Sequence, residues 1–134
     1  MSMWLPPAPE SEILMIMKSF AEVFPEGSIW GGLEFPGFYL IGGHRSLQQS
    51  PAQIDELANK LSRLDDLGEW GPTYRDPAKL RQLYIMDAAA STRMTAGVHA
   101  VTDDKPYTEF PLWRRFLKPD QMEEFTADKL RKSR

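Results

Sequence analysis

Hydrophobic residues recur at intervals of three and four positions across residues 11–24, the spacing of one face of an α-helix. Ser11 is a typical N-cap residue, and Pro25 and Gly27 interrupt the pattern at its far end. The spacing therefore predicts an amphipathic helix over residues 11–24, capped by Ser11. The three prolines within residues 1–9 exclude a helix before it.

Two short runs rich in β-branched and aromatic residues follow, at residues 28–33 and 38–41. A Glu-Phe-Pro-Gly turn separates them, so the two runs predict a β-hairpin. The second run does not alternate polar with apolar residues, and we therefore expect its strand to be covered on both faces rather than to lie at an edge.

Two later helices are predicted by a capping residue followed by proline, Ser50 with Pro51 and Asp76 with Pro77. The apolar face of the second of these helices extends towards residue 90, and residues 68–75 form a turn-rich connection between the two. A last, thinly apolar helix is expected over residues 120–130.

These elements predict an α+β fold, in which an antiparallel hairpin or small sheet packs with three to four helices. The chain of 134 residues has the size of one domain. We expect a single small domain over residues 1–118 and a C-terminal helix or basic tail over residues 119–134.

The composition favours a soluble, cytoplasmic chain. The longest apolar run, residues 13–17, is far shorter than the roughly 20 residues that cross a bilayer, so no membrane span is expected. The chain contains no cysteine, which excludes a disulfide framework. A formal net charge of −3 does not favour nucleic-acid binding, although the basic residues near the C-terminus leave an anionic partner as an alternative.

No glycine-rich nucleotide loop, nucleophile elbow or zinc motif occurs in the sequence, and we therefore expect no catalytic residue, no cofactor and no metal in this chain. Trp30 is a candidate ligand contact because it lies beside two glycines at the end of a predicted strand. Tyr39 is a second candidate, although both aromatic residues also fit a core. The carboxylates Asp103, Asp104 and Glu109 are further candidates, with a structural turn as the competing interpretation of the Asp-Asp pair.

Three segments, in this order, resemble the C-terminal region of spermidine-synthase-like proteins. The first is Trp-Leu-Pro at residues 4–6 with the helix that ends in Phe-Ala-Glu-Val-Phe-Pro, and the second is the predicted hairpin. The third is Thr-Asp-Asp-Lys-Pro-Tyr-Thr-Glu-Phe at residues 102–110, which is similar to the terminal signature of that family. The resemblance covers about residues 4–116 and implies the C-terminal part of a methyltransferase-like α/β fold.

The resemblance also implies what this chain lacks. The family's nucleotide-binding half and its catalytic aspartates precede this region, and Phe24 with Pro25 stands where the family has Tyr-Pro beside the polyamine pocket. We therefore expect a non-catalytic, self-associating fragment or subunit, because a hairpin without its large sheet leaves a strand edge to be covered. One alternative is half of a split aminopropyltransferase-like enzyme that needs a separate nucleotide-binding chain, and another is a small adaptor for an anionic partner.

Overall fold

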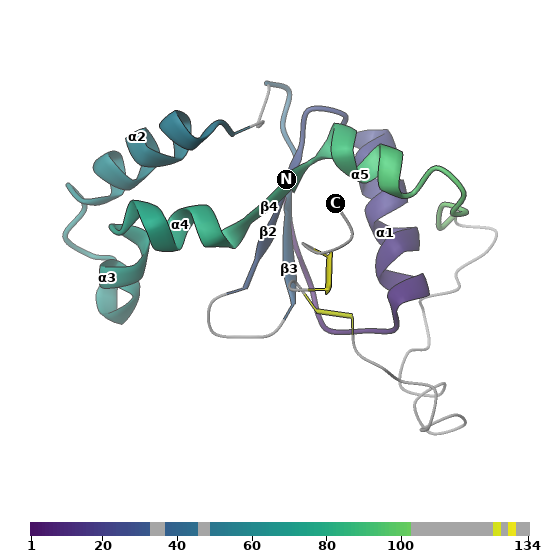
Figure 1. The fold of residues 1–134 in the computed structure, drawn as a ribbon, viewed down its shortest axis with the longest axis horizontal. Coiled ribbons are helices and arrows are strands. Elements are labelled where there is room, and N and C mark those ends of the chain that lie inside the picture. Colours follow the sequence, from purple (N-terminus) through teal and green to yellow (C-terminus); the bar gives the residue numbers. More distant parts are fainter. Residues whose placement is uncertain (33–36, 46–48, 103–124, 127–128, 131–134) are drawn as a thin grey trace.

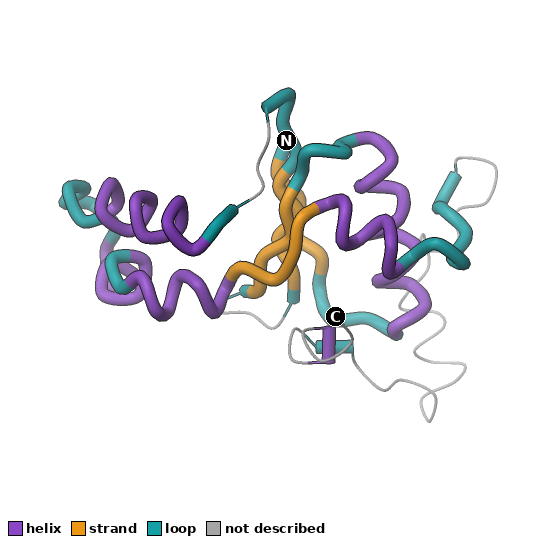
Figure 2. The backbone as a smooth tube through the Cα atoms, turned by 45° about the horizontal axis from the view of Figure 1, so that its top comes forward, coloured by secondary structure: helices purple, strands orange, loops and turns teal. Residues whose placement is uncertain are grey.

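A four-stranded antiparallel sheet forms the centre of the computed structural model, which describes residues 1–32, 37–45, 49–102, 125–126 and 129–130 (Figures 1 and 2). The strand order across the sheet is β1-β3-β2-β4. The strands are β1 (Ser2–Leu5), β2 (Ser28–Gly31), β3 (Phe38–Ile41) and β4 (Tyr84–Asp87).

Helices lie on both faces of this sheet, with α1 and α5 on one side and the group of α2, α3 and α4 on the other (Figure 1). The predicted α+β class is confirmed. The described residues contain five α-helices and one 3₁₀ helix: α1 (Glu10–Val23), α2 (Pro51–Leu61), η1 (Gly68–Trp70), α3 (Gly71–Tyr74), α4 (Pro77–Leu83) and α5 (Ala88–Met94). The sequence predicted fewer helices because α3 and α5 are only one or two turns long.

Helix α1 lies where the helix over residues 11–24 was predicted, but its N-cap is a different residue. Ile13, Met17 and Phe20 are buried against the sheet, as the apolar spacing requires. The N-cap residue is Pro9, not Ser11: the Pro9 carbonyl accepts the N–H groups of residues 12 and 13 at 3.0 and 3.1 Å. Ser11 therefore lies inside the first turn and makes no side-chain cap. A proline can stand there because an N-cap residue needs to offer only its carbonyl.

Strands β2 and β3 form the predicted hairpin, with Trp30 directly opposite Tyr39. Strand β3 is interior to the sheet, as expected, but it is not covered on both faces. Phe38 and Leu40 face the core and are fully buried, whereas Tyr39, which points to the opposite face, is 38% exposed. The expectation was wrong because the helices on the second face pack over only part of the sheet.

The two proline-marked helix starts are confirmed. Ser50 forms a complete capping box with Gln53, and the Asp76 carboxylate accepts the N–H groups of residues 78 and 79. Helices α2 and α4 then pack on each other through Ile54 and two further buried side chains, Ala58 and Leu80. The connection over residues 68–75, predicted as turns, is helical instead, because η1 and α3 follow each other there.

The extension of the third predicted helix towards residue 90 is wrong. Helix α4 ends at Leu83, and Tyr84 takes up an extended conformation that begins β4. Strand β4 pairs with β2, and Asp87 then caps the separate helix α5 by accepting the Ala90 N–H at 2.6 Å. Pairing with β2 thus overrides a locally helical sequence.

The main core lies between α1, α5 and the sheet, and it includes two residues from the end of the chain. Phe125 packs on Phe38 with ring centroids 6.5 Å apart, and Leu130 is fully buried. The division into residues 1–118 and 119–134 stays a prediction. Among the described residues, no helix is both long enough and apolar enough to cross a membrane. The cytoplasmic location likewise stays a prediction.

Candidate functional site

Four aromatic residues form a continuous row across one face of the sheet, which we call the aromatic row. Trp4 on β1 lies opposite Tyr39 on β3, Tyr39 lies opposite Trp30 on β2, and Trp30 lies opposite Tyr84 on β4. Directly opposed residues of antiparallel strands project from the same face. The sheet therefore brings together four aromatic side chains that are spread over some eighty positions of the sequence.

The Trp30 indole is fixed within this row. Its Nε1–H donates to the Oγ of the buried Ser28 at 2.9 Å. The Tyr84 ring stands edge-on to it, with centroids 5.2 Å apart and ring planes at 74°. Such edge-to-face pairs are favourable for aromatic rings, so the indole has a defined position rather than a choice of rotamers.

A pocket of about 300 Å³ opens between the aromatic row and the helices of the second face, and we call it the aromatic pocket. Trp30 and Tyr39 form its sheet side, and Tyr74 of α3 faces them from the helical side. Ile41, Leu80 and Leu83 add aliphatic side chains to the wall, and Ser2 of β1 and Gly31 of β2 also line it. None of the described residues that line it is charged. As far as the structure describes it, this pocket therefore suits an uncharged, apolar group.

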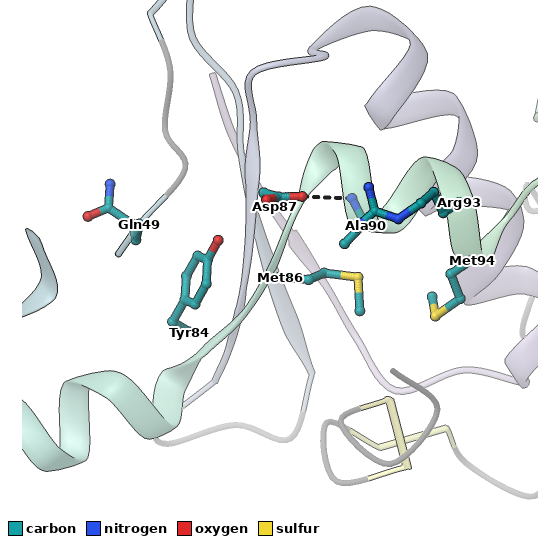
Figure 3. A pocket seen from close by; sticks show the side chains of 7 residues that line it. All are labelled: Gln49, Tyr84, Met86, Asp87, Ala90, Arg93 and Met94. Carbon is teal, nitrogen blue, oxygen red and sulfur yellow. Dashed lines mark hydrogen bonds between the residues drawn. The ribbon is translucent and has the colours of Figure 1, made fainter. Parts of the chain in front are cut away.

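A second pocket, of about 600 Å³, lies between β4, α5 and the segment that leads into α2 (Figure 3). It is more polar: Gln49 lies across from Tyr84, and Asp87 and Arg93 lie further along (Figure 3). One carboxylate oxygen of Asp87 already accepts the Ala90 N–H. Asp87 therefore stabilises the first turn of α5 as its N-cap, independently of any ligand in the pocket.

The sequence-predicted site residues divide into two groups. The structure brings Trp30 and Tyr39 together as neighbours in the aromatic pocket. Asp103, Asp104 and Glu109 lie outside the described residues, and so does nearly all of the predicted turn over 102–110. The chain leading to that turn is attached to α1, because the Val101 N–H donates to the Ser19 Oγ at 2.7 Å and that hydroxyl lies 3.2 Å from the Val101 carbonyl.

Sequence reasoning missed Tyr74 and Tyr84 as contributors to these pockets. Each lies at the end of a short element, α3 or β4, that has no clear periodic pattern. The only available signal was that a tyrosine follows the helix opened by Asp76 and Pro77, and this signal does not reveal the pairing of β4 with β2.

Among the described residues, one carboxyl has a resolved pKa shift, and it lies away from both pockets. Glu56 and Lys60, one turn apart on α2, form an ion pair at 2.8 Å. The hydrogen bond from Lys60, together with its charge, lowers the pKa of the Glu56 carboxyl. Within the described ranges, no group of three or more acidic or histidine side chains is placed to hold a metal ion.

Strand β1 lies at one end of the strand order. Its bonds to β3 show which of its backbone N–H and C=O groups point towards β3 and which point away. The Met1 amino nitrogen donates to the Gly42 carbonyl at 2.7 Å, and the Gly42 N–H returns a bond to Met1 at 2.8 Å. Residues of an antiparallel pair alternate between bonded and non-bonded positions. Met3 therefore bonds to Leu40, and the backbone groups of Ser2 point away from β3. In the described part of the chain, no strand pairs with that side of β1.

No family model, no curated protein and no solved structure matches this chain. The resemblance to spermidine-synthase-like proteins therefore stays a proposal, and the features of this chain that bear on function are the edge of β1 and the two pockets.

Proposed function

We propose that this chain is a non-catalytic subunit, related to the C-terminal region of spermidine-synthase-like proteins, that acts by self-association through β1. The observation that supports the proposal is the position of β1. Among the described strands it lies at the end of the sheet, with the backbone groups of Ser2 directed away from β3. An exposed strand edge is a template for another strand. The absence of a glycine-rich nucleotide loop from the sequence supports the non-catalytic assignment.

The composition of β1 favours pairing rather than protection. Natural sheets protect edge strands with charged residues or proline, but the segment Ser2–Leu5 contains neither. Trp4 adds apolar surface at this edge, because its side chain is 48% exposed. Burying that surface against a partner stabilises the complex in addition to the backbone hydrogen bonds.

A second copy of the chain is the occupant that we propose. Two β1 strands related by a two-fold axis can run antiparallel, which gives a closed dimer with the same surface used twice. If the axis passes beside Met3, Ser2 of each copy lies opposite residue 4 of the other. The two sheets then join into one continuous sheet, which doubles the four described strands of each copy to eight.

Replacement of Ser2 by proline tests this pairing. We expect Ser2→Pro to weaken the dimer about 30-fold, because two symmetry-related N–H donors are lost at about 1 kcal/mol each. The fold should be retained, since Ser2 is at a non-bonded position of the β1–β3 ladder and proline is tolerated at such edge positions. Sedimentation velocity over a range of concentrations measures the effect.

Ser2→Ala is the matched control, because it removes the same hydroxyl and keeps the backbone N–H. It should associate as tightly as the parent chain. A parent chain that sediments as a monomer at all concentrations contradicts self-association and favours the alternative of a separate nucleotide-binding chain. A Ser2→Pro dimer as tight as the parent dimer contradicts the use of β1.

A further inference from the structure

We propose that the aromatic pocket is a binding site for an uncharged, flat molecule of about two fused rings. This inference is independent of the self-association of β1. It rests on the shape of the pocket, the chemistry of its walls and the way in which its central indole is fixed.

The size of the pocket limits the ligand. An apolar cavity of about 150 Å³ holds one benzene molecule, and small-molecule pockets begin at about 300 Å³. The aromatic pocket, at about 300 Å³, therefore has room for a bicyclic ring.

The walls favour flat over bulky shapes. Trp30 and Tyr39 are neighbours on one flat surface of the sheet, and Tyr74 closes the space from α3. Aromatic rings pack well face-to-offset-face or edge-to-face with another ring. A flat ring can contact all three aromatic side chains, whereas a saturated ring of the same size contacts them through its hydrogens and gains less.

The polar groups of the pocket favour a neutral ligand. Among the described residues that line the pocket, none is charged, so a charged ligand would lose hydration without meeting an opposite charge from them. The Trp30 indole N–H is already bonded to Ser28. The Tyr39 hydroxyl makes no hydrogen bond to another described residue, so it can donate to or accept from one polar atom on the ligand.

The position of Trp30 is set before any ligand arrives. The bond to Ser28 and the edge-on contact with Tyr84 fix the ring from two directions. A site that is already ordered loses less side-chain entropy on binding. Tyr39, at 38% exposure, lies where the pocket opens to solvent.

Titration of the full chain with 2-naphthol tests the proposal, with the Trp30 indole N–H signal in the nitrogen-15 spectrum as the readout. We expect saturable binding that shifts this signal. Two control compounds keep the fused two-ring carbon skeleton. In 2-decalol the rings are saturated, and in 2-naphthoate a charged carboxylate replaces the hydroxyl. Both should bind at least about tenfold more weakly. A signal from Trp30 that does not move on addition of 2-naphthol overturns the proposal, and so does equal binding of 2-decalol.

Two variants locate the site. Tyr39→Ala should weaken 2-naphthol binding about tenfold through loss of one aromatic contact. Val23→Ala removes an exposed side chain of α1 on the other side of the sheet and should leave the affinity unchanged. Unchanged affinity in Tyr39→Ala, with the variant folded as judged by its melting curve, overturns the assignment of the pocket.

Discussion

Replacement of Phe38 by alanine is expected to lower the free energy of unfolding by about 3–5 kcal/mol, the usual cost of truncating a buried phenylalanine. Phe38 is 0% exposed and is the largest fully buried side chain of the described core. It lies opposite Leu5 of β1 and packs on Phe125, so it joins the sheet to the two ends of the chain. Its loss leaves a cavity at a point where three distant segments meet.

Chemical denaturation of Phe38→Ala and of the parent chain measures this difference. Val23→Ala is the control, because Val23 is 69% exposed and its truncation should change stability by less than about 0.5 kcal/mol. Equal stability of Phe38→Ala and the parent would contradict the position of β3 at the centre of the core.

Replacement of Gly37 by alanine should also be strongly destabilising, by at least about 2 kcal/mol. Gly37 has a φ of +149°, a region that residues with a side chain avoid. A Cβ at this position would lie 2.5 Å from the Leu5 carbonyl oxygen, which is backbone and cannot rotate away. The substitution should therefore push β1 away from β3, in addition to straining the turn.

Two other glycines distinguish the effect of the clash with Leu5 from the effect of the positive φ. Gly68 also has a positive φ, of +56°, but a Cβ there would meet no described atom within 4 Å, so Gly68→Ala should cost only the conformational strain of about 1 kcal/mol. Gly97 has open space around it and no positive φ, and Gly97→Ala should be neutral. Thermal unfolding of the three variants would contradict the account if Gly37→Ala were no more destabilised than Gly68→Ala.

The elements that could be predicted from the sequence are those encoded locally. The apolar spacing of α1 and the capping residues Ser50 and Asp76 each act within a few positions of the chain. The hairpin of β2 and β3 is also local, because only six positions of the sequence separate its two strands. These features are present in the structure within one or two residues of their predicted bounds, apart from the cap of α1.

The elements that could not be predicted depend on pairing between distant segments. Strands β1 and β4 have four residues each, which is too short for a recognisable period. They become strands because Met3 pairs with Leu40 and Met86 pairs with Ile29. The aromatic row is a result of the same pairings. Trp30 could therefore be proposed as a ligand contact from its local surroundings, whereas Tyr84 could not.

The two proposals concern adjoining parts of the same sheet, and Ser2 belongs to both, through its backbone at the strand edge and as one of the residues that line the pocket. The strand edge of β1 supports assembly, and the aromatic pocket between the sheet and α3 supports binding of a small ligand. Trp4 and Tyr39 are adjacent members of the aromatic row, so the dimer axis and the pocket lie within two strands of each other. In a dimer formed through β1, a ring bound in the aromatic pocket would therefore lie next to the interface between the copies.

Cysteine cross-linking at Met3 tests the central claim most directly, because the chain has no cysteine of its own. In a dimer centred on Met3, this residue lies opposite its own copy at a non-bonded position, where Cα atoms are about 4.5 Å apart and a disulfide can form. We predict that Met3→Cys forms a covalent dimer on mild oxidation, whereas a cysteine at the exposed Thr92 of α5 does not. A folded Met3→Cys chain that cross-links no faster than Thr92→Cys would contradict association through β1.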